Sequence, residues 1–289
     1  MNPIEQLHNH HSRLINKIHD LIRRAISFPP DVSLLISYCS EFLIPHATGE
    51  EHTLYLSLGD DVLRGRLTEE HGRLRKLLDD TRQSFARGDE GQIRANLGEF
   101  TALLDSHFEE EENILMPALM NKLGTEELES LIKQAHVIEE NGRGGDIDSL
   151  FELDHKRIDL NIASLSSRKA GKNPPAEIFD RMKRQLVNHI DLEERILFPA
   201  FTDHSGIGPD GPVQVMVMEH RGIKEALRNT EEVVRSGDSF DQKLREVIGR
   251  LAVHNKKEEL ILYPSILRSL PGPERSRIFA ECFEQMTSV

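Results

Sequence analysis

Apolar residues recur three and four positions apart along most of this chain, and no long stretch alternates apolar with polar residues. This period places the apolar side chains on one face of a helix, whereas a half-buried strand requires alternation. Four of these helical faces also carry a histidine that is followed by Leu or Ile three and seven residues later, namely His11, His71, His155 and His220. The pattern predicts amphipathic helices on which each of these histidines faces a core.

Turn-forming segments separate the helical stretches. They read FPPD at 28–31, RGD at 87–89, GKNPP at 171–175 and SGIGPDGP at 205–212. Pro and Gly end helices and favour turns. Short connections make neighbouring helices antiparallel.

The order of these elements repeats in the second half of the chain. We therefore predict an all-α fold of two tandem up-down four-helix bundles, residues 1–140 and 146–289, joined by the glycine-rich stretch ENGRGGD at 140–146. A short extra helix is expected after each bundle. The two candidate segments are GTEELESLIKQ, after Leu123, and GPERSRIFAEC, after Pro271.

A second motif occurs four times: His, three residues, Glu-Glu, and a Leu eight residues after the His. The copies begin at His46, His107, His189 and His254. With 14 histidines in the chain, composition alone would produce about one or two pairs of His and Glu four residues apart. His136 and Glu140 form such a pair, but they lack the Leu, and we expect His136, like His204, to be an ordinary exposed histidine. Four copies that share the doubled Glu and the Leu exceed this background.

The spacing of the motif predicts metal chemistry. Residues four apart lie one turn above each other on a helix, so each His and its first Glu point the same way. Antiparallel helices would gather four imidazoles and two carboxylates at one level of each bundle. Two ions that share these ligands fit better than one tetrahedral zinc. Mixed imidazole and carboxylate ligands favour iron, with manganese or zinc as substitutes, over calcium or magnesium.

Net charge limits the choice of partner. The formal charge of −13 and the absence of a long basic cluster argue against nucleic acid, because phosphate binding needs concentrated Lys and Arg. Much of the acidity lies in the glutamates of the four motifs, where cation binding explains it.

Composition also limits the compartment. No run approaches the ~20 apolar residues of a membrane-spanning helix, and the first residues, MNPIEQLHNHH, do not resemble a signal peptide. Cys39 and Cys282 lack the spacing of a disulfide framework or a zinc knuckle. We expect a cytoplasmic protein with no membrane partner.

These residues resemble the hemerythrin-like, or HHE cation-binding, domain, a four-helix bundle around a non-haem di-iron centre. The resemblance covers nearly the whole chain as two copies. It implies two sets of iron ligands. The first set is His11, His46, Glu50, His71, His107 and Glu111, and the second set is His155, His189, Glu193, His220, His254 and Glu258.

Departures from the oxygen-carrying members of that family narrow the implied function. The carriers have a further His four residues after the third-helix His, where this chain has Arg75 and Lys224. Four imidazoles and two glutamates are more similar to the branch associated with iron-centre repair, nitric oxide and peroxide. The resemblance thus implies a small ligand such as O2, NO or peroxide, and a di-iron oxidoreductase is one hypothesis. The alternatives are an iron- or oxygen-sensing or reversible O2-binding module without turnover, and a structural or storage role.

Three features of the sequence each allow two interpretations. Pro45 and Gly49 flank His46 and either open a substrate pocket by kinking the helix or mark a displaced helix start with Pro45 near its cap. We favour the second interpretation. His10 competes with His11 as the ligand, but Arg13 would then lie on the core face of the helix, so we favour His11. The second Glu of each motif lies about 100° around the helix from the first and is expected to be solvated or to support a ligand.

Metal should stabilise both bundles. Two glutamates in an apolar interior repel each other and raise each other's pKa, and divalent ions would neutralise them. Binding only to the folded state at a hundred times the dissociation constant adds about 2.7 kcal/mol to the free energy of unfolding. Thermal unfolding with and without chelator should show this loss, and an unchanged midpoint would contradict buried metal sites.

Overall fold

The computed structural model describes residues 3–144, 147–167, 176–206, 211–234 and 239–288. The chain divides into two compact units, Met1–Gly144 and Gly145–Val289, and the division falls within the 140–146 stretch. Throughout the described ranges the ordered elements are helices and no strand occurs. The predicted all-α fold of tandem helical bundles is therefore confirmed.

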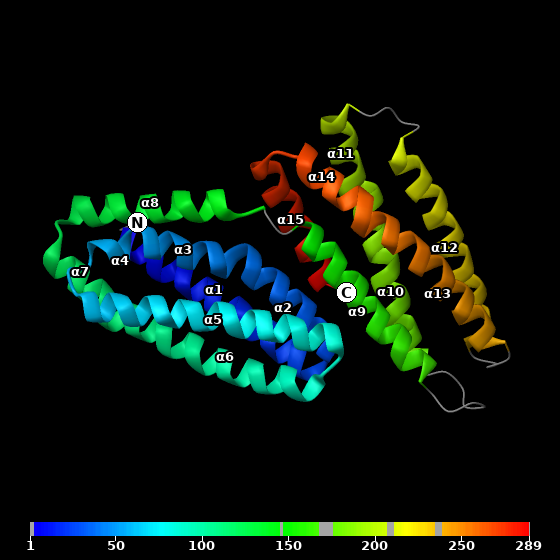
Figure 1. Ribbon diagram of the computed structural model, residues 1–289, viewed down its shortest axis with the longest axis horizontal. Helices are drawn as coiled ribbons and strands as arrows, with labels where there is room; N and C mark the ends of the chain where they lie inside the picture. Colours follow the sequence, from blue (N-terminus) through cyan, green and yellow to red (C-terminus); the bar gives the residue numbers. More distant parts are fainter. Residues whose placement is uncertain (1–2, 145–146, 168–175, 207–210, 235–238, 289) are drawn as a thin grey trace. The chain divides into compact units, whose positions relative to one another are not determined.

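Unit 1 is a bundle of long helices (Figure 1). Along the chain they are α1 (Pro3–Ser27), α2 (Val32–Tyr38) continuing into α3 (Ile44–His52), the short α4 (Leu54–Ser57), α5 (Asp61–Arg87), α6 (Glu90–Glu110) continuing into α7 (Met116–Lys122), and α8 (Thr125–Gly142). A single turn of 3-10 helix, Pro29–Asp31, joins α1 to α2.

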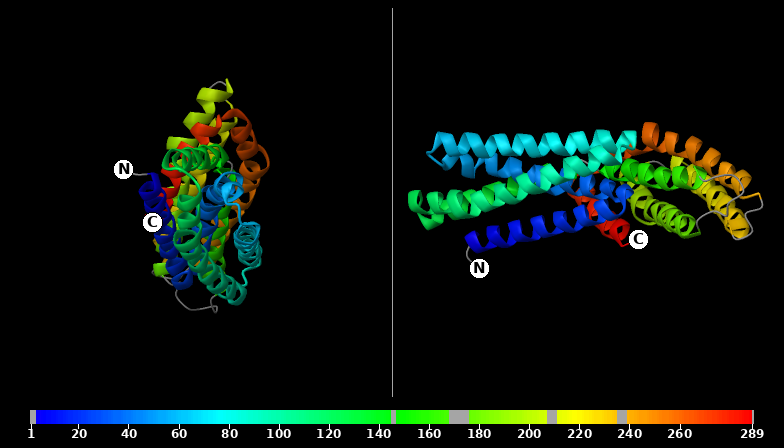
Figure 2. Two further views of the ribbon diagram at one scale, coloured as in Figure 1. Left: turned by 90° about the vertical axis from the view of Figure 1, so that its left-hand side faces the viewer. Right: turned by 90° about the horizontal axis from the view of Figure 1, so that it is seen from below.

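Unit 2 repeats this order. Its helices are α9 (Ile147–Ser166), α10 (Ala176–Leu192) continuing into α11 (Phe198–Ser205), α12 (Pro212–Val234), α13 (Phe240–Lys257) continuing into α14 (Tyr263–Ser269), and α15 (Gly272–Thr287). The third and fourth helices pack lengthwise in each unit, α5 with α6 and α12 with α13 (Figure 2). The core of unit 2 is an apolar cluster between α9, α10, α12 and α13, in which Leu165, Phe179 and Phe240 are fully buried.

The fifth helix of each unit is an integral part of the fold. The sequence predicted short helices here, but α8 and α15 have 18 and 16 residues and are as long as other helices of the bundles. In each unit the fifth helix packs on the first two, α8 on α1 and α3, and α15 on α9 and α10. Buried Leu128 and Ile132 of α8 join the same apolar cluster as Tyr55 and Leu119.

A π-helical turn interrupts each helix that carries the repeated motif. Three of these turns begin at the first Glu of the motif, and they cover Glu111–Leu115, Glu193–Leu197 and Glu258–Leu262. In each, the N–H of the following residue donates to the carbonyl five residues earlier, as Met116 does to Glu111. A proline comes next, at 117, 199 and 264. Proline has no N–H to donate and its ring clashes with the carbonyl four residues earlier, so a wide turn accommodates it.

The fourth π turn, Cys39–Leu43, lies before His46 instead of after it, and Pro45 follows it. A separate α segment does begin at Ile44, with His46 in its first turn, but the helical chain already starts at Val32. The expected displaced start at Pro45 is therefore a junction within a longer helix.

Gly49 allows α8 to pack closely on α3. A Cβ at Gly49 would lie 2.6 Å from the carbonyl oxygen of Ala135, and a Cβ at Gly142 would lie 3.1 Å from Cβ of Pro45. Gly49 and Gly142 therefore allow α3 and α8 to pack closely beside His46.

A sharp bend ends α3. Thr53 has φ −132° and ψ −77°, and its hydroxyl donates to the carbonyl of Gly49 at 2.7 Å. After this bend, α4 places Tyr55 in the core with 1% of its surface exposed.

Within the described ranges, no helix combines the length and the apolar character needed to cross a membrane.

Gly49→Ala should destabilise unit 1 by roughly 1–3 kcal/mol, because the added methyl group overpacks against the backbone of α8. Gly98→Ala is the matched control, since a Cβ there meets nothing within 4 Å and should stabilise α6 by up to about 1 kcal/mol. Denaturant unfolding of both variants measures the difference. Equal stability of the two variants would contradict the close contact between α3 and α8.

Candidate metal centres

Each unit buries one cluster of four histidines and two glutamates. Each of these twelve residues is at most 4% exposed. In unit 1 they come from α1, α3, α5 and α6 with the π turn after it, and in unit 2 from α9, α10, α12 and α13 with the corresponding turns. The structure thus brings together every residue of the two predicted ligand sets.

Within unit 1 the ligand atoms form two adjoining groups. His71 and His107 lie with Glu50 and Glu111, and His11 and His46 lie with Glu50, all ligand atoms of each group being within 4.8 Å of one another. The Nε2 atoms of His71 and His107 are 2.8 Å apart. Two imidazole pairs that share one carboxylate, here Glu50, are an arrangement expected of a dinuclear centre.

Unit 2 has the same division. His220 and His254 lie with Glu193 and Glu258, and their Nε2 atoms are 2.9 Å apart. His155 and His189 lie with Glu258, and their ring centroids are 4.5 Å apart.

The second Glu of each motif faces the Nδ1 atom of a histidine on another helix. Glu51 lies 2.9 Å from Nδ1 of His71, Glu194 lies 2.9 Å from Nδ1 of His220, and Glu259 lies 2.8 Å from Nδ1 of His155. Glu112 lies 3.9 Å from Nδ1 of His11. These glutamates therefore support the imidazoles and are not in the clusters themselves.

The acids immediately before His71, His155 and His220 support the motif histidines in the same way. Glu70 lies 2.7 Å from Nδ1 of His107, Glu219 lies 3.0 Å from Nδ1 of His254, and Asp154 lies 3.0 Å from Nδ1 of His189. The sequence alone did not suggest these three acids, although each directly precedes His71, His220 or His155.

His46 is the exception, because residue 10 is a histidine where the other three helices have an acid. Its Nδ1 atom faces Glu139 of α8 instead, at 3.5 Å. An acceptor at Nδ1 holds the proton there and leaves the Nε2 lone pair directed at the cluster. Seven of the eight imidazoles therefore have a carboxylate within 3.5 Å of Nδ1, whereas Nδ1 of His11 has no hydrogen-bond partner among the described residues.

Unpartnered atoms at the cluster centres show what the sites fit. Among the described residues, several deeply buried atoms have no hydrogen-bond partner, namely Nε2 of His46 and His189 and one carboxylate oxygen each of Glu50, Glu111, Glu193 and Glu258. Buried polar atoms without partners are costly and rare. Cations between the imidazoles and carboxylates would satisfy them, and this donor set suits iron, manganese or zinc.

The pKa values of the glutamates do not all rise, as mutual repulsion in an apolar interior would predict. Burial and the Glu111 carboxylate raise the pKa of Glu50 well above its usual range, as predicted. Burial also acts to raise the pKa of Glu111, but the imidazole of His107 outweighs it and the pKa falls. Hydrogen bonds from His155 and His220 likewise lower the pKa of Glu258 despite burial. The expected increase is therefore wrong for these last two glutamates.

The raised pKa values of some histidines complement this result. Burial lowers the pKa of His107, but Glu111 and Glu70 outweigh it and raise it to about 9. Glu193 and Glu258 likewise raise the pKa of His220 to about 10 against burial. A cation bound between these imidazoles and carboxylates would compete with the protons on the imidazoles.

A buried tyrosine hydroxyl adjoins each cluster, which the sequence analysis missed. Tyr55 donates to Glu111 and lies 3.3 Å from Nε2 of His71. Tyr263 donates to Glu193 at 2.6 Å and lies 3.4 Å from Nε2 of His155. Both tyrosines stand nine residues after a motif histidine, which is the sequence signal that identifies them.

The two tyrosines lie at opposite ends of their centres. Tyr55 follows His46 and stacks on His71, whereas the corresponding residue of unit 2, Phe198, stacks on His220 with 5.7 Å between ring centroids. Tyr263 instead comes from the fourth helix. The two clusters therefore have the same types of ligand residues, but the tyrosine hydroxyl lies beside a different imidazole pair in each.

Each unit has a surface pocket, and the one in unit 1 reaches His11 of its cluster. In unit 1 it has a volume of about 240 Å³ and is lined by His11, Phe108 and Glu112, among others. In unit 2 its volume is about 380 Å³, and its lining includes Asn255 and Glu259 at the positions of Phe108 and Glu112. In unit 1, Phe108 lies against His11 with 4.9 Å between ring centroids.

The positions of a fifth imidazole in the oxygen carriers hold cations that point elsewhere. Arg75 donates to Glu51 at 2.8 Å, and Lys224 donates to Asp191 at 2.8 Å. Both therefore contact acids beside the cluster and not the cluster itself.

Residues 2–119 and 146–266 each match the family described as hemerythrin HHE cation binding domain. The two matches cover the first four helices of each unit.

A protein of Nostoc sp. (strain PCC 7120 / SAG 25.82 / UTEX 2576) described as a DNA nickase is 23% identical over 131 residues. The match spans 44% of this chain and 35% of that protein, so the chain covers about a third of its length. No solved structure matches the chain.

Glu70→Ala should weaken metal binding in unit 1 by roughly 10–100-fold, because His107 loses the acceptor that orients it. Glu69→Ala removes an exposed acid from the neighbouring position and is the control for the change in net charge. Competition for Fe²⁺ against a chelator of known affinity measures both variants. If both bind Fe²⁺ as tightly as the wild type does, Glu70 has no part in holding the site.

Proposed function

Because this chain belongs to the hemerythrin HHE cation binding domain family through both of its units, we propose that it is a di-iron protein acting on a small ligand, O2, NO or peroxide. One observation carries the proposal. In each unit, four imidazoles and two carboxylates are buried as two adjoining groups of ligand atoms.

The ligand count leaves room for a small molecule. Six protein side chains are shared between two ions, and Arg75 and Lys224 stand where a fifth imidazole would be. An iron pair held in this way would supply one-electron chemistry and open coordination positions. The protein contributes the imidazoles, and in seven of the eight a carboxylate within 3.5 Å of Nδ1 orients the ring.

The tyrosine hydroxyls favour reaction over simple carriage. Tyr55 and Tyr263 each hold a proton at Oη, hydrogen-bonded to a carboxylate of the cluster. Burial, with the neighbouring carboxylates, raises the pKa of each well above that of free tyrosine. A neutral hydroxyl at this place can donate a hydrogen bond or a proton to an oxygen atom of the ligand.

DNA is not a partner in this proposal, despite the name of the Nostoc protein. The chain carries a formal net charge of −13, and DNA binding requires concentrated positive charge opposite the phosphates. The match to that protein covers only about a third of its length.

Metal content tests the proposal first. Protein purified without added metal should contain two irons per unit, with visible absorption that changes on anaerobic reduction and on addition of O2, NO or peroxide. Zinc as the only metal, or a single metal per chain, would overturn the di-iron assignment. Full reversibility with O2 and no turnover of peroxide or NO would instead support the carrier or sensor alternative.

Tyr55→Phe and Tyr263→Phe should keep the iron but slow the reaction with peroxide or NO, by about 100-fold where the hydroxyl supplies the proton. Tyr38→Phe is the control, because the ring of Tyr38 packs against Phe42 at a tilt of 37° and belongs to neither cluster. Stopped-flow absorption of the reduced protein measures the rates. Unchanged rates in both single variants and in their combination would exclude the hydroxyls as proton donors.

A further inference from the structure

The fifth helix of unit 1 contacts a histidine of the dinuclear cluster directly. Glu139 of α8 is 2% exposed, and its Oε2 atom lies 3.5 Å from Nδ1 of His46. Six other histidines of the two clusters have an acid 2.7–3.0 Å from Nδ1, and each of those acids lies on one of the first four helices of its unit. The support of His46 therefore comes from outside the four-helix bundle, and it is a longer contact.

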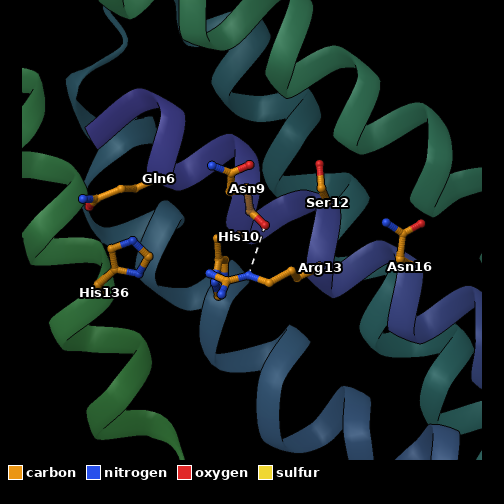
Figure 3. A pocket seen from close by; sticks show the side chains of 7 residues that line it. All are labelled: Gln6, Asn9, His10, Ser12, Arg13, Asn16 and His136. Carbon is orange, nitrogen blue, oxygen red and sulfur yellow. Dashed lines mark hydrogen bonds between the residues drawn. The ribbon is translucent and has the colours of Figure 1, made fainter. Parts of the chain in front are cut away.

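Polar groups surround α8 at the level of this contact. A solvent-accessible pocket of about 520 Å³ lies between α1 and α8, lined by His136 and by polar side chains of α1. Figure 3 shows the imidazole of His136, on α8, beside that of His10, on α1, with 5.4 Å between ring centroids. The buried apolar residues of α8 come earlier in the helix, and the buried residue that follows Ala135 is Glu139 itself. Packing of the second half of α8 therefore relies on polar contacts.

The end of α8 is attached to the helix that carries the motif histidine. The N–H of Gly144 donates to the buried carboxylate of Glu41 at 2.6 Å. The guanidinium of Arg143 lies over the ring of Phe42, 5.0 Å from its centroid, and also pairs with Glu139. Both Glu41 and Phe42 belong to the π turn before the motif histidine. The contacts of the last turn of α8 therefore gather around one histidine of the cluster.

Unit 2 supports the corresponding histidine from its first helix. Asp154 of α9 lies 3.0 Å from Nδ1 of His189, and Arg157 of the same helix pairs with it at 3.4 Å. The fifth helix contributes a backbone carbonyl, that of Met286, to which Arg157 donates at 3.4 Å. The buried apolar residues of α15 are Ile278, Phe279, Cys282, Phe283 and Met286. Compared with α8, α15 thus has more apolar packing and a less direct connection to the cluster.

We propose that the docking of α8 on unit 1 is coupled to occupancy of the dinuclear centre, with Glu139 as the positioning residue that connects them. This coupling rests on the proposed function only in requiring a cation at that centre. Nε2 of His46 has no hydrogen-bond partner among the described residues. A cation bound there would fix the ring with its Nδ1 proton directed at Glu139. The contact with Glu139 would then shorten to a hydrogen bond and hold α8 more firmly.

Such a coupling acts in both directions. A cation that favours the docked helix by a given factor is itself bound more tightly, by the same factor, when the helix is docked. Couplings of this kind are typically about 5–150-fold. The family match ends at residue 119, and α8 begins at Thr125, so the coupling belongs to a helix that follows the matched domain.

Hydrogen–deuterium exchange of the full chain tests the coupling. Peptides from residues 125–142 and 272–287 are compared in protein saturated with Fe²⁺ and in protein stripped with chelator. Iron should slow exchange in the second half of α8 by about fivefold or more, and it should change α15 less. In Glu139→Ala the effect on α8 should fall to that on α15. Glu140→Ala, which removes an exposed neighbouring acid, should leave the effect intact.

Two results would overturn the coupling. One is equal slowing of α8 and α15 in the wild type, a comparison that needs no variant to fold. The other is the same slowing of α8 in Glu139→Ala as in the wild type at equal iron content, which is measured on each sample.

The outcome also separates the coupling from the di-iron proposal. Iron bound in both units without a change in α8 would contradict the coupling and leave the di-iron proposal standing. If the chain binds no iron, the measurement is repeated with Zn²⁺, which the same ligand types accept. Slowing of α8 by Zn²⁺ would then support the coupling and contradict the di-iron assignment, whereas binding of neither metal would overturn both.

Discussion

Ionisable carboxylates at the centre of an apolar bundle set the main constraint on both units. Glu50, Glu111, Glu193 and Glu258 are each at most 1% exposed. Removing a carboxylate from water costs several kcal/mol unless opposite charge and hydrogen bonds compensate. Imidazoles from four helices supply part of that compensation. The raised pKa of Glu50 shows that compensation is incomplete at that carboxylate, which bound cations would stabilise.

Orientation of the imidazoles is the second requirement, and it links the cluster to the rest of each unit. Seven of the eight histidines in the clusters have an acid within 3.5 Å of Nδ1, and these acids lie on a different helix from the histidine they face. The acid that faces the second-helix histidine differs between the units. It is Asp154 of the first helix for His189 and Glu139 of the fifth helix for His46. Once α8 supplies the carboxylate, residue 10 no longer needs to be acidic. Repeated domains can diverge in this way without losing a ligand.

Helix geometry follows the same motif. The prolines at 117, 199 and 264 come directly after π turns that begin at the motif glutamates. In the α2–α3 helix both the proline and the π turn have moved to the other side of His46. Proline in the sequence therefore marks the wide turn in all four helices, and its displacement in this one accompanies the close contact of Gly49 with α8.

The sequence by itself determined the all-α class, the duplication and the faces on which the ligands lie. A His and a Glu four residues apart share a helical face whatever the helix packs against, so His46 and Glu50 could be paired without a structure. Sequence reasoning also favoured His11 over His10, because Arg13 would otherwise lie on the core face. The structure places His11 within 3.2 Å of Glu50.

Only the tertiary structure decided which faces meet. Glu139 and His136 lie on a helix whose sequence gives no sign that it covers His46, and Tyr55 reaches the cluster only after the bend at Thr53. These contacts depend on how closely two helices approach, as α8 does at Gly49. Local periodicity specifies the face a side chain occupies, but close packing between distant segments specifies its neighbours.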